Sequence, residues 1–188
     1  MGVKNYLIEG VSCTGKTTVA EELRWRGYHV VHGDQELAYL GDPQTGERLD
    51  SCADGSDSVN WRHEHHIWDV EKVKSLLADR RHARSFFCGG SRNFRHFIYR
   101  FDAVFILDID VGTLNRRLAL RPADQFGGNE SERALIARLH ETKEDIPNDA
   151  VNIDANAKPE PPAKRLIVRR EASNALEWKV AAGAADAP

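Results

Sequence analysis

The chain has 188 residues, of which 41% are hydrophobic and 29% charged, and its formal net charge at pH 7 is −3. This length and composition predict one domain with a sizeable core. The mildly acidic balance gives no general reason to expect nucleic acid or a membrane surface as partner, although a local basic patch stays open. No apolar run approaches the roughly 18 residues of a membrane span and the N-terminus lacks a secretory pattern, so we expect a cytoplasmic protein. Three cysteines without metal-type spacing argue against a disulfide framework.

Residues 10–17 are Gly-Val-Ser-Cys-Thr-Gly-Lys-Thr, which is the Gly-x-x-x-x-Gly-Lys-[Ser/Thr] pattern of a phosphate-binding loop. Apolar residues before it predict a buried strand, and apolar residues at helical spacing from Lys16 to Arg26 predict a helix after it. Such a loop points backbone N–H groups at phosphate oxygens and adds the positive end of the helix dipole. We expect Lys16 to reach the β/γ-phosphates and Thr17 to bind Mg²⁺. The expected nucleotide contacts from this segment are Gly10, Ser12, Cys13, Thr14, Gly15, Lys16, Thr17 and Thr18.

Five short strands alternate with helical segments along the chain. The predicted strands are residues 6–8, 28–31, 85–88, 103–107 and 150–153. This alternation predicts a three-layer α/β/α fold with a five-stranded parallel sheet, whose ligand site lies at the carboxyl ends of the strands. Three polar residues follow strands at that edge: Asp34, Arg92 and Asp108. We expect Asp34 and Arg92 to contact substrate, and Asp34 and Asp108 to contact the metal through water.

Between the second and third strands the pattern is less informative. Residues 41–58 are rich in Gly, Asp and Ser, which predicts an irregular or mobile excursion over the active face. Apolar residues at helical spacing predict one amphipathic helix over residues 60–82. We expect its histidines on a helical surface rather than at a metal, and its tryptophans in the core or stacked on an aromatic acceptor. These side chains are Trp61, His63, His65, His66 and Trp68.

In the second half of the chain, arginines precede a short break in the helical pattern. Arg117 and Arg121 precede a segment at about residues 122–130 that we expect to be a short lid. Asn129, with Glu132 three residues later, predicts the start of the next helix. A last helix is predicted over residues 161–168. The expected domain therefore covers residues 1–172, followed by a flexible tail at residues 173–188.

Taken in order, these motifs resemble the P-loop small-molecule kinases of the nucleoside monophosphate kinase superfamily, which includes the adenylate and shikimate kinases. The resemblance spans roughly residues 4–170. It implies ATP and Mg²⁺ as cofactors, with Lys16, Arg117 and Arg121 neutralising charge at the transferred phosphoryl group. It also implies that Arg92 and Arg138 contact the acceptor and that Ala155 lies against the adenine. The matching stretches are His32-Gly33-Asp34, Gly89-Gly90-Ser91-Arg92, Arg117-Leu118-Ala119-Leu120-Arg121, Arg138-Leu139 and Ile153-Asp154-Ala155.

Two departures from the adenylate kinase pattern bear on the substrate. Cys88 replaces an aspartate at a strand end, so the water shell of Mg²⁺ falls to Asp34 or Asp108. Leu37 stands where an arginine holds the acceptor's phosphate, which favours a neutral hydroxyl acceptor whose proton passes to Asp34.

The predicted function is ATP-dependent phosphoryl transfer to a small molecule, with a nucleoside- or nucleotide-like compound as the first candidate. One alternative is a polynucleotide-end kinase or RNA-associated P-loop protein, because arginines and aromatic residues alternate between residues 80 and 100. Another is a nucleotide-binding switch or ATPase, although no Asn-Lys-x-Asp run selects guanine. Acceptor identity, ATP or GTP preference, oligomeric state and any redox activity of Cys13 do not follow from the sequence.

Overall fold

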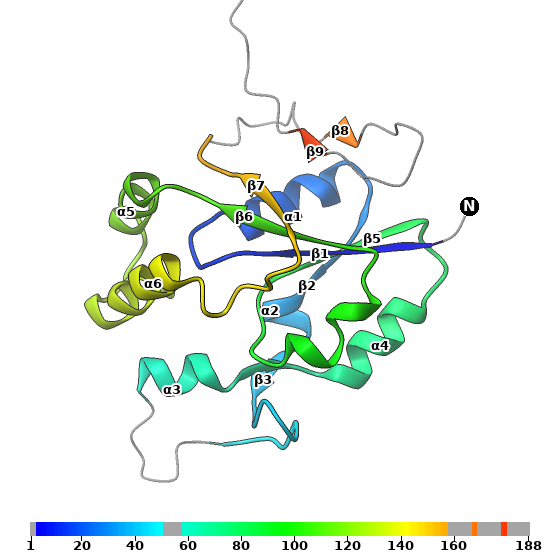
Figure 1. The fold of residues 1–188 in the computed structure, drawn as a ribbon, viewed down its shortest axis with the longest axis horizontal. Helices are drawn as coiled ribbons and strands as arrows, with labels where there is room; N and C mark the ends of the chain where they lie inside the picture. Colours follow the sequence, from blue (N-terminus) through cyan, green and yellow to red (C-terminus); the bar gives the residue numbers. More distant parts are fainter. Residues whose placement is uncertain (1–2, 51–57, 158–166, 169–177, 180–188) are drawn as a thin grey trace, which may run out of the picture.

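The central feature is a five-stranded parallel sheet in the order β2-β5-β1-β6-β7 (Figure 1). The computed structural model describes residues 3–50, 58–157, 167–168 and 178–179. Each of the five predicted strands is present in this sheet, so the predicted fold class is confirmed. Their bounds are β1 Lys4–Glu9, β2 His29–His32, β5 Arg84–Cys88, β6 Ala103–Asp108 and β7 Val151–Asp154.

Helices cover both faces of the sheet because its strands are apolar on both sides. Tyr6 and Ile8 of β1 pack with α1 (Lys16–Trp25), whereas Leu7 between them packs toward α4 (Val70–Ala78). Figure 1 shows α1 above the sheet and α4 below it. A third apolar cluster joins α5 (Val111–Ala119) to α6 (Glu130–Thr142), which lie together beyond the carboxyl ends of the strands.

Polar side chains begin these helices as the sequence predicts. The Asn129 carboxamide accepts from the backbone N–H of Glu132 at 3.0 Å, which confirms the start of α6. The Glu132 carboxylate does not return to the cap residue. It accepts from the N–H of Gly127 at 2.7 Å and so holds the turn of the expected lid against α6.

The prediction of one helix over residues 60–82 is wrong. The segment forms α3 (Val59–Glu64), β4 (His66–Trp68) and α4, and β4 pairs antiparallel with β3 (Ala38–Leu40). The break occurs because the backbone N–H of Trp68 donates to Asn93 Oδ1 at 3.0 Å, which removes it from a helical ladder. Asp69 then starts α4 by accepting from the N–H of Lys72 at 3.0 Å. Long-range hydrogen bonds therefore override a helical apolar pattern.

The preceding segment, predicted as an irregular or mobile excursion, folds into a hydrogen-bonded turn over the part that is described. Asp42 Oδ1 accepts from the N–H groups of Gln44 and Thr45, both at 2.8 Å. Gly41 bridges to Arg48, which extends the β3–β4 region by one more antiparallel pairing. Residues 51–57 lie outside the described residues.

Short elements complete the described chain. They are α2 (Gly33–Glu36), the 3₁₀ turns η1 (Phe94–His96) and η2 (Ile98–Arg100), and the paired strands β8 (Ile167–Val168) and β9 (Trp178–Lys179). Strand β8 contradicts the end of the helix predicted over residues 161–168, in keeping with the strand preference of β-branched residues. Most of that helix and of the expected tail lies outside the described residues. Among those that are described, no helix has the length and apolar content needed to cross a bilayer.

Candidate active site

The loop between β1 and α1 has a backbone that two of its glycines make possible. Gly10 has φ +146°, and a Cβ there would lie 2.6 Å from the carbonyl oxygen of Leu107. Gly15 has φ +109° and stands at the N-cap of α1, whose first turn contains no acidic residue. The first N–H groups of α1 therefore face a position without local negative charge, and this cradle fits a phosphate group.

The side chains of the loop divide into two groups. The Thr14 hydroxyl is buried and donates to the carbonyl oxygen of Val11 at 2.8 Å, so it fixes the shape of the loop. Lys16 Nζ lies over the loop and donates to the carbonyl oxygens of Gly10 and Val11. Thr17, in contrast, is exposed in the first turn of α1, where its hydroxyl is accessible to a metal ion.

A cavity of about 750 Å³ opens beside this loop. Its walls come from the end of β1, from β3, α3 and β4, from the turn after β5, from residues 121–126 and from α6. These elements are far apart in sequence and meet where the parallel strands end. The charged and histidine side chains of the lining are Glu9, Lys16, Asp34, Arg62, His63, His66, Arg92, Arg121, Asp124, Glu132 and Asp145.

Asp34 lies on the cavity wall at the carboxyl end of β2, as predicted. Its Oδ1 accepts from the backbone N–H of Gly90 at 3.2 Å and lies 3.4 Å from His66 Nε2. Partial burial opposes ionisation, but the hydrogen bond from His66 and the charge of Lys16 outweigh it and hold the pKa of Asp34 below its ordinary value. Asp34 is therefore an anion at neutral pH.

Glu9, the last residue of β1, is a cavity residue that the motif analysis missed. Its side chain is only 4% exposed and lines the cavity next to the phosphate loop. Burial raises the pKa of Glu9 to about 8; the charge of Lys16 opposes this shift and that of Asp145 adds to it. A signal was available, since this charged residue directly follows the apolar run Tyr6-Leu7-Ile8 and directly precedes the phosphate loop.

Arg92 lines the cavity, with an acidic partner beside it, and its contact with the acceptor stays a prediction. Asp145 Oδ2 lies 3.8 Å from Arg92 Nη1 and 3.6 Å from His63 Nε2. Burial raises the pKa of Asp145 against the attraction of Arg92. Burial, helped by repulsion from Arg92, lowers the pKa of His63 to about 4, so this imidazole is neutral at pH 7. No sequence motif had pointed to Asp145.

Solved kinase structures share this architecture. A shikimate kinase from Bacteroides thetaiotaomicron aligns over 81% of this chain and 87% of its own, with TM-score 0.50 and 16% identity. A sugar kinase from Janibacter sp. HTCC2649 aligns over 84% of this chain and 88% of its own, with TM-score 0.49 and 19% identity. A possible uridine kinase from Bacillus stearothermophilus aligns over 82% of this chain and 90% of its own, with TM-score 0.45 and 18% identity. The fold is that of the P-loop kinases. No protein-family model and no curated protein sequence matches the chain.

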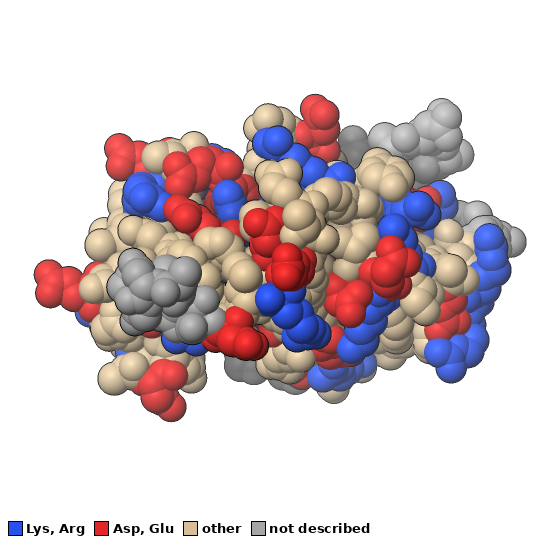
Figure 2. All heavy atoms as spheres, turned by 90° about the horizontal axis from the view of Figure 1, so that it is seen from below, with Lys and Arg blue, Asp and Glu red and all other residues tan. Residues whose placement is uncertain are grey.

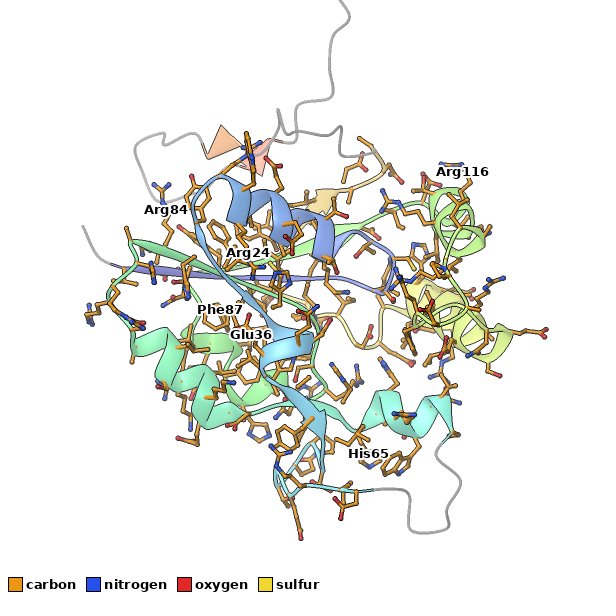
Figure 3. The ribbon with its side chains drawn as sticks, turned by 180° about the vertical axis from the view of Figure 1, so that it is seen from behind. Arg24, Glu36, His65, Arg84, Phe87 and Arg116 are labelled. Carbon is orange, nitrogen blue, oxygen red and sulfur yellow. The ribbon has the colours of Figure 1, made fainter. Side chains whose placement is uncertain are left out.

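In this P-loop kinase fold, Arg117 ties the phosphate loop to the turn after β7. Its Nη1 donates to the carbonyl oxygens of Cys13 at 3.1 Å and Thr14 at 2.9 Å, and its Nη2 donates to that of Ala155 at 2.7 Å. The neighbouring Arg116 points outward from α5 (Figure 3). Arg117 thus joins the loop to the expected adenine position, and its role at the transferred phosphoryl group stays a prediction.

The other predicted residues divide between the cavity and its surroundings. Arg121 lines the cavity at the start of the expected lid. Arg138 is outside the lining and pairs with Glu144 at 3.3 Å. Asp108 is also outside it and pairs with Lys143 at 2.7 Å, beside a smaller cavity of about 230 Å³. Arg121, like Asp34 and Arg92, therefore shares the cavity with Lys16.

The three neighbouring histidines have separate partners. His63 faces Asp145, His66 faces Asp34, and His65 stacks on Trp61 with ring centroids 4.4 Å apart. Within the described ranges no three His, Cys, Asp or Glu side chains are grouped for a metal ion. Trp68 is fully buried, which confirms its prediction as a core residue.

Basic side chains do not form an unbroken surface on the face shown in Figure 2, where acidic side chains lie among them. Arg84 and Arg116 lie at opposite ends of the molecule in Figure 3. These views add nothing in favour of the nucleic-acid alternative, which needs a continuous basic track.

Proposed function

We propose that the protein transfers the γ-phosphoryl group of ATP to a hydroxyl group of a small molecule, with a nucleoside- or nucleotide-like acceptor as first candidate. The observation that carries this proposal is that Lys16 and Asp34 line the same cavity. Lys16 belongs to the phosphate loop, and Asp34 is an anion beside the space for a second substrate. One cavity thus combines a donor-binding cation with a carboxylate that accepts from a hydroxyl group.

The residues of the loop fit a magnesium-bound nucleoside triphosphate. The glycine-lined cradle and the start of α1 suit the phosphates, and the exposed Thr17 hydroxyl suits the metal. When bound, Mg²⁺ neutralises charge on the β- and γ-phosphate oxygens. Of the two carboxylates proposed for its water shell, Asp34 shares the cavity with the loop, whereas Asp108 pairs with Lys143 outside it.

Asp34 would hold the acceptor hydroxyl group in line with the phosphorus atom. As the new O–P bond forms and the bond to the bridging oxygen of the donor breaks, the hydroxyl proton passes to Asp34. A carboxylate with a low pKa is a weak base for a free alcohol, so this transfer belongs late in the reaction, when the attacking oxygen is already bonded to phosphorus. Lys16 and Arg121 supply positive charge around the transferred group.

The cavity also favours a neutral acceptor with an aromatic part. Asp145 stands beside Arg92, so the charge of this arginine already has an acidic neighbour. Leu37 is buried in the core and leaves no cation at its position. Phe126, which lines the cavity and is 43% exposed, offers a ring on which a nucleobase can stack. These features support a nucleoside more than a monophosphate.

The test is release of ADP from ATP and Mg²⁺ with uridine, adenosine, UMP, shikimate and D-ribose as acceptors. We expect acceptor-dependent release that Lys16→Ala abolishes and that the surface variant Lys74→Ala leaves unchanged. Asp34→Asn should lower kcat by about 10²-fold or more, with little change in the Kd for Mg·ATP. Absence of acceptor-dependent release across the panel would contradict the proposal, and intact kcat in Asp34→Asn would remove Asp34 from the mechanism.

A further inference from the structure

Glu9 has a carboxylate oxygen without a partner in the described part of the chain. The side chain is 4% exposed, and its Oε2 atom is fully buried without a hydrogen bond. A buried polar atom left in this state costs free energy, so it calls for an explanation such as a bound molecule. Because Glu9 lines the cavity, a molecule bound there can form a hydrogen bond with its carboxyl group.

Glu9 and Asp34 are held by consecutive amides of one turn. The N–H of Gly90 donates to Asp34, and the N–H of Ser91 donates to Glu9. The two glycines of this turn make room for both groups: a Cβ on Gly89 would lie 2.6 Å from Asp34 Oδ1, and a Cβ on Gly90 would lie 3.1 Å from Glu9 Oε1. Glu9 and Asp34 therefore both contact this one turn, and both line the same cavity.

The charges around Glu9 favour a carboxyl group that keeps its proton. The groups that face it are Lys16 from α1, Asp34 from α2 and Asp145 from the segment after α6. One cationic side chain thus stands against two acidic ones, and Glu9 itself is only 4% exposed. A protonated carboxyl group donates as well as accepts hydrogen bonds, whereas Asp34 only accepts.

We propose that Glu9 binds the acceptor directly, by donating a hydrogen bond to an oxygen atom next to the hydroxyl group that Asp34 holds. The acceptor then presents a sugar-like part, with neighbouring oxygen atoms, to the wall formed by Glu9 and Asp34. For a nucleoside this places the ribose at that wall and the base toward Phe126. The inference rests on the proposed function and names the part of the acceptor that lies against Glu9 and Asp34.

The experiment compares wild type with Glu9→Gln, which keeps volume and a donor, and Glu9→Leu, which removes both polar functions. Glu71→Leu, on the exposed surface of α4, is the control. Acceptor KM and kcat are measured at pH 6.5 and 9 with the acceptors that turn over, and the Kd for Mg·ATP is measured by calorimetry. Thermal unfolding checks that each variant is folded.

We expect the wild-type acceptor KM to rise about tenfold from pH 6.5 to 9 as Glu9 loses its proton, and this rise to vanish in Glu9→Gln. Glu9→Leu should raise acceptor KM about tenfold at pH 6.5 with an unchanged Kd for Mg·ATP. An unchanged acceptor KM in Glu9→Leu, or a pH dependence that persists in Glu9→Gln, would overturn the inference. So would a loss of Mg·ATP affinity in Glu9→Leu without any effect on acceptor KM.

Failure of the proposed function has a different signature. If no compound of the panel supports ADP release, the same compounds are tested for binding by saturation-transfer NMR. A compound that binds wild type and Glu9→Gln but not Glu9→Leu would support the role of Glu9 although the kinase proposal had failed. Equal binding to all three proteins, or no binding to any, would refute it.

Discussion

Replacing Glu9 with glutamine removes a proton equilibrium that links the stability of the fold to pH. The folded pKa of Glu9 is about 8, whereas its ordinary value is 4.5. Above pH 4.5 the unfolded chain therefore releases a proton that the folded chain keeps, until the folded group also ionises near pH 8. Stability contributed by this group is fully present below pH 4.5 and falls as pH rises to about 8.

The size of the effect follows from the two pKa values. Each pH unit between them costs about 1.4 kcal/mol, so the whole interval costs at most about 5 kcal/mol. Between pH 6.5 and 8, where the folded group begins to ionise, the same relation gives a loss of roughly 1 to 2 kcal/mol. This loss should be present in wild type and absent from Glu9→Gln.

The stability measurement starts at pH 6.5 because of His63, whose pKa is lowered to about 4. That shift has the opposite sign, because the unfolded imidazole binds a proton that the folded one does not. His63 therefore makes stability rise with pH from about 4 to 6.5, and most of this rise is complete above pH 6.5. The difference between wild type and Glu9→Gln isolates Glu9 because His63 is common to both proteins.

Urea unfolding at pH 6.5, 7.2 and 8.0 measures the difference, with Glu71→Gln as a surface control. The gap in unfolding free energy between Glu9→Gln and wild type should grow by roughly 1 to 2 kcal/mol across this range. Parallel stability curves for the two proteins would show that Glu9 has the same proton affinity folded and unfolded. The description of its buried site would then be wrong.

Three other substitutions test the framework around the site. Gly33→Ala should destabilise by about 1–3 kcal/mol, because its Cβ would lie 1.9 Å from Cζ2 of Trp68; unchanged urea unfolding would refute this packing. Asp69→Ala should cost about 1 kcal/mol of unfolding free energy through loss of the α4 cap, and a neutral effect would show that this cap contributes little. Arg117→Ala should raise the Kd for Mg·ATP about tenfold or more, because two hydrogen bonds to the phosphate loop and one to Ala155 are lost; calorimetry that finds wild-type affinity would contradict this role.

Local sequence patterns were sufficient to predict the strands that are buried on both faces of the sheet and the elements that depend on a short-range motif. The five apolar runs became the five strands, and the Asn129 cap began α6 where expected. The phosphate loop also follows from local rules, since Gly10 and Gly15 adopt backbone angles that other residues rarely tolerate. The position of Asp34 was predictable because it follows a strand of the parallel sheet, whereas its role in the site stays a prediction.

Residues 60–82 show why the same reasoning failed elsewhere. Their apolar spacing fits a helix, but Asn93, distant in sequence, binds the backbone of Trp68 and ends the helical pattern. Asp145 was missed for a related reason. Nothing near it in the sequence indicates that it stands beside Arg92 and His63, which approach from other elements.

The amino-acid sequence alone determined the sheet, the glycine-containing loop after β1 and the edge of the sheet where the candidate site lies, because each depends on the side-chain period or backbone freedom of a few adjacent residues. Tertiary structure alone decided the chemistry of the cavity. The protonation of Glu9, the neutral state of His63 and the acidic neighbour of Arg92 depend on burial and on charges from distant segments. Electric fields act through space, so their sources cannot be inferred from neighbours along the chain.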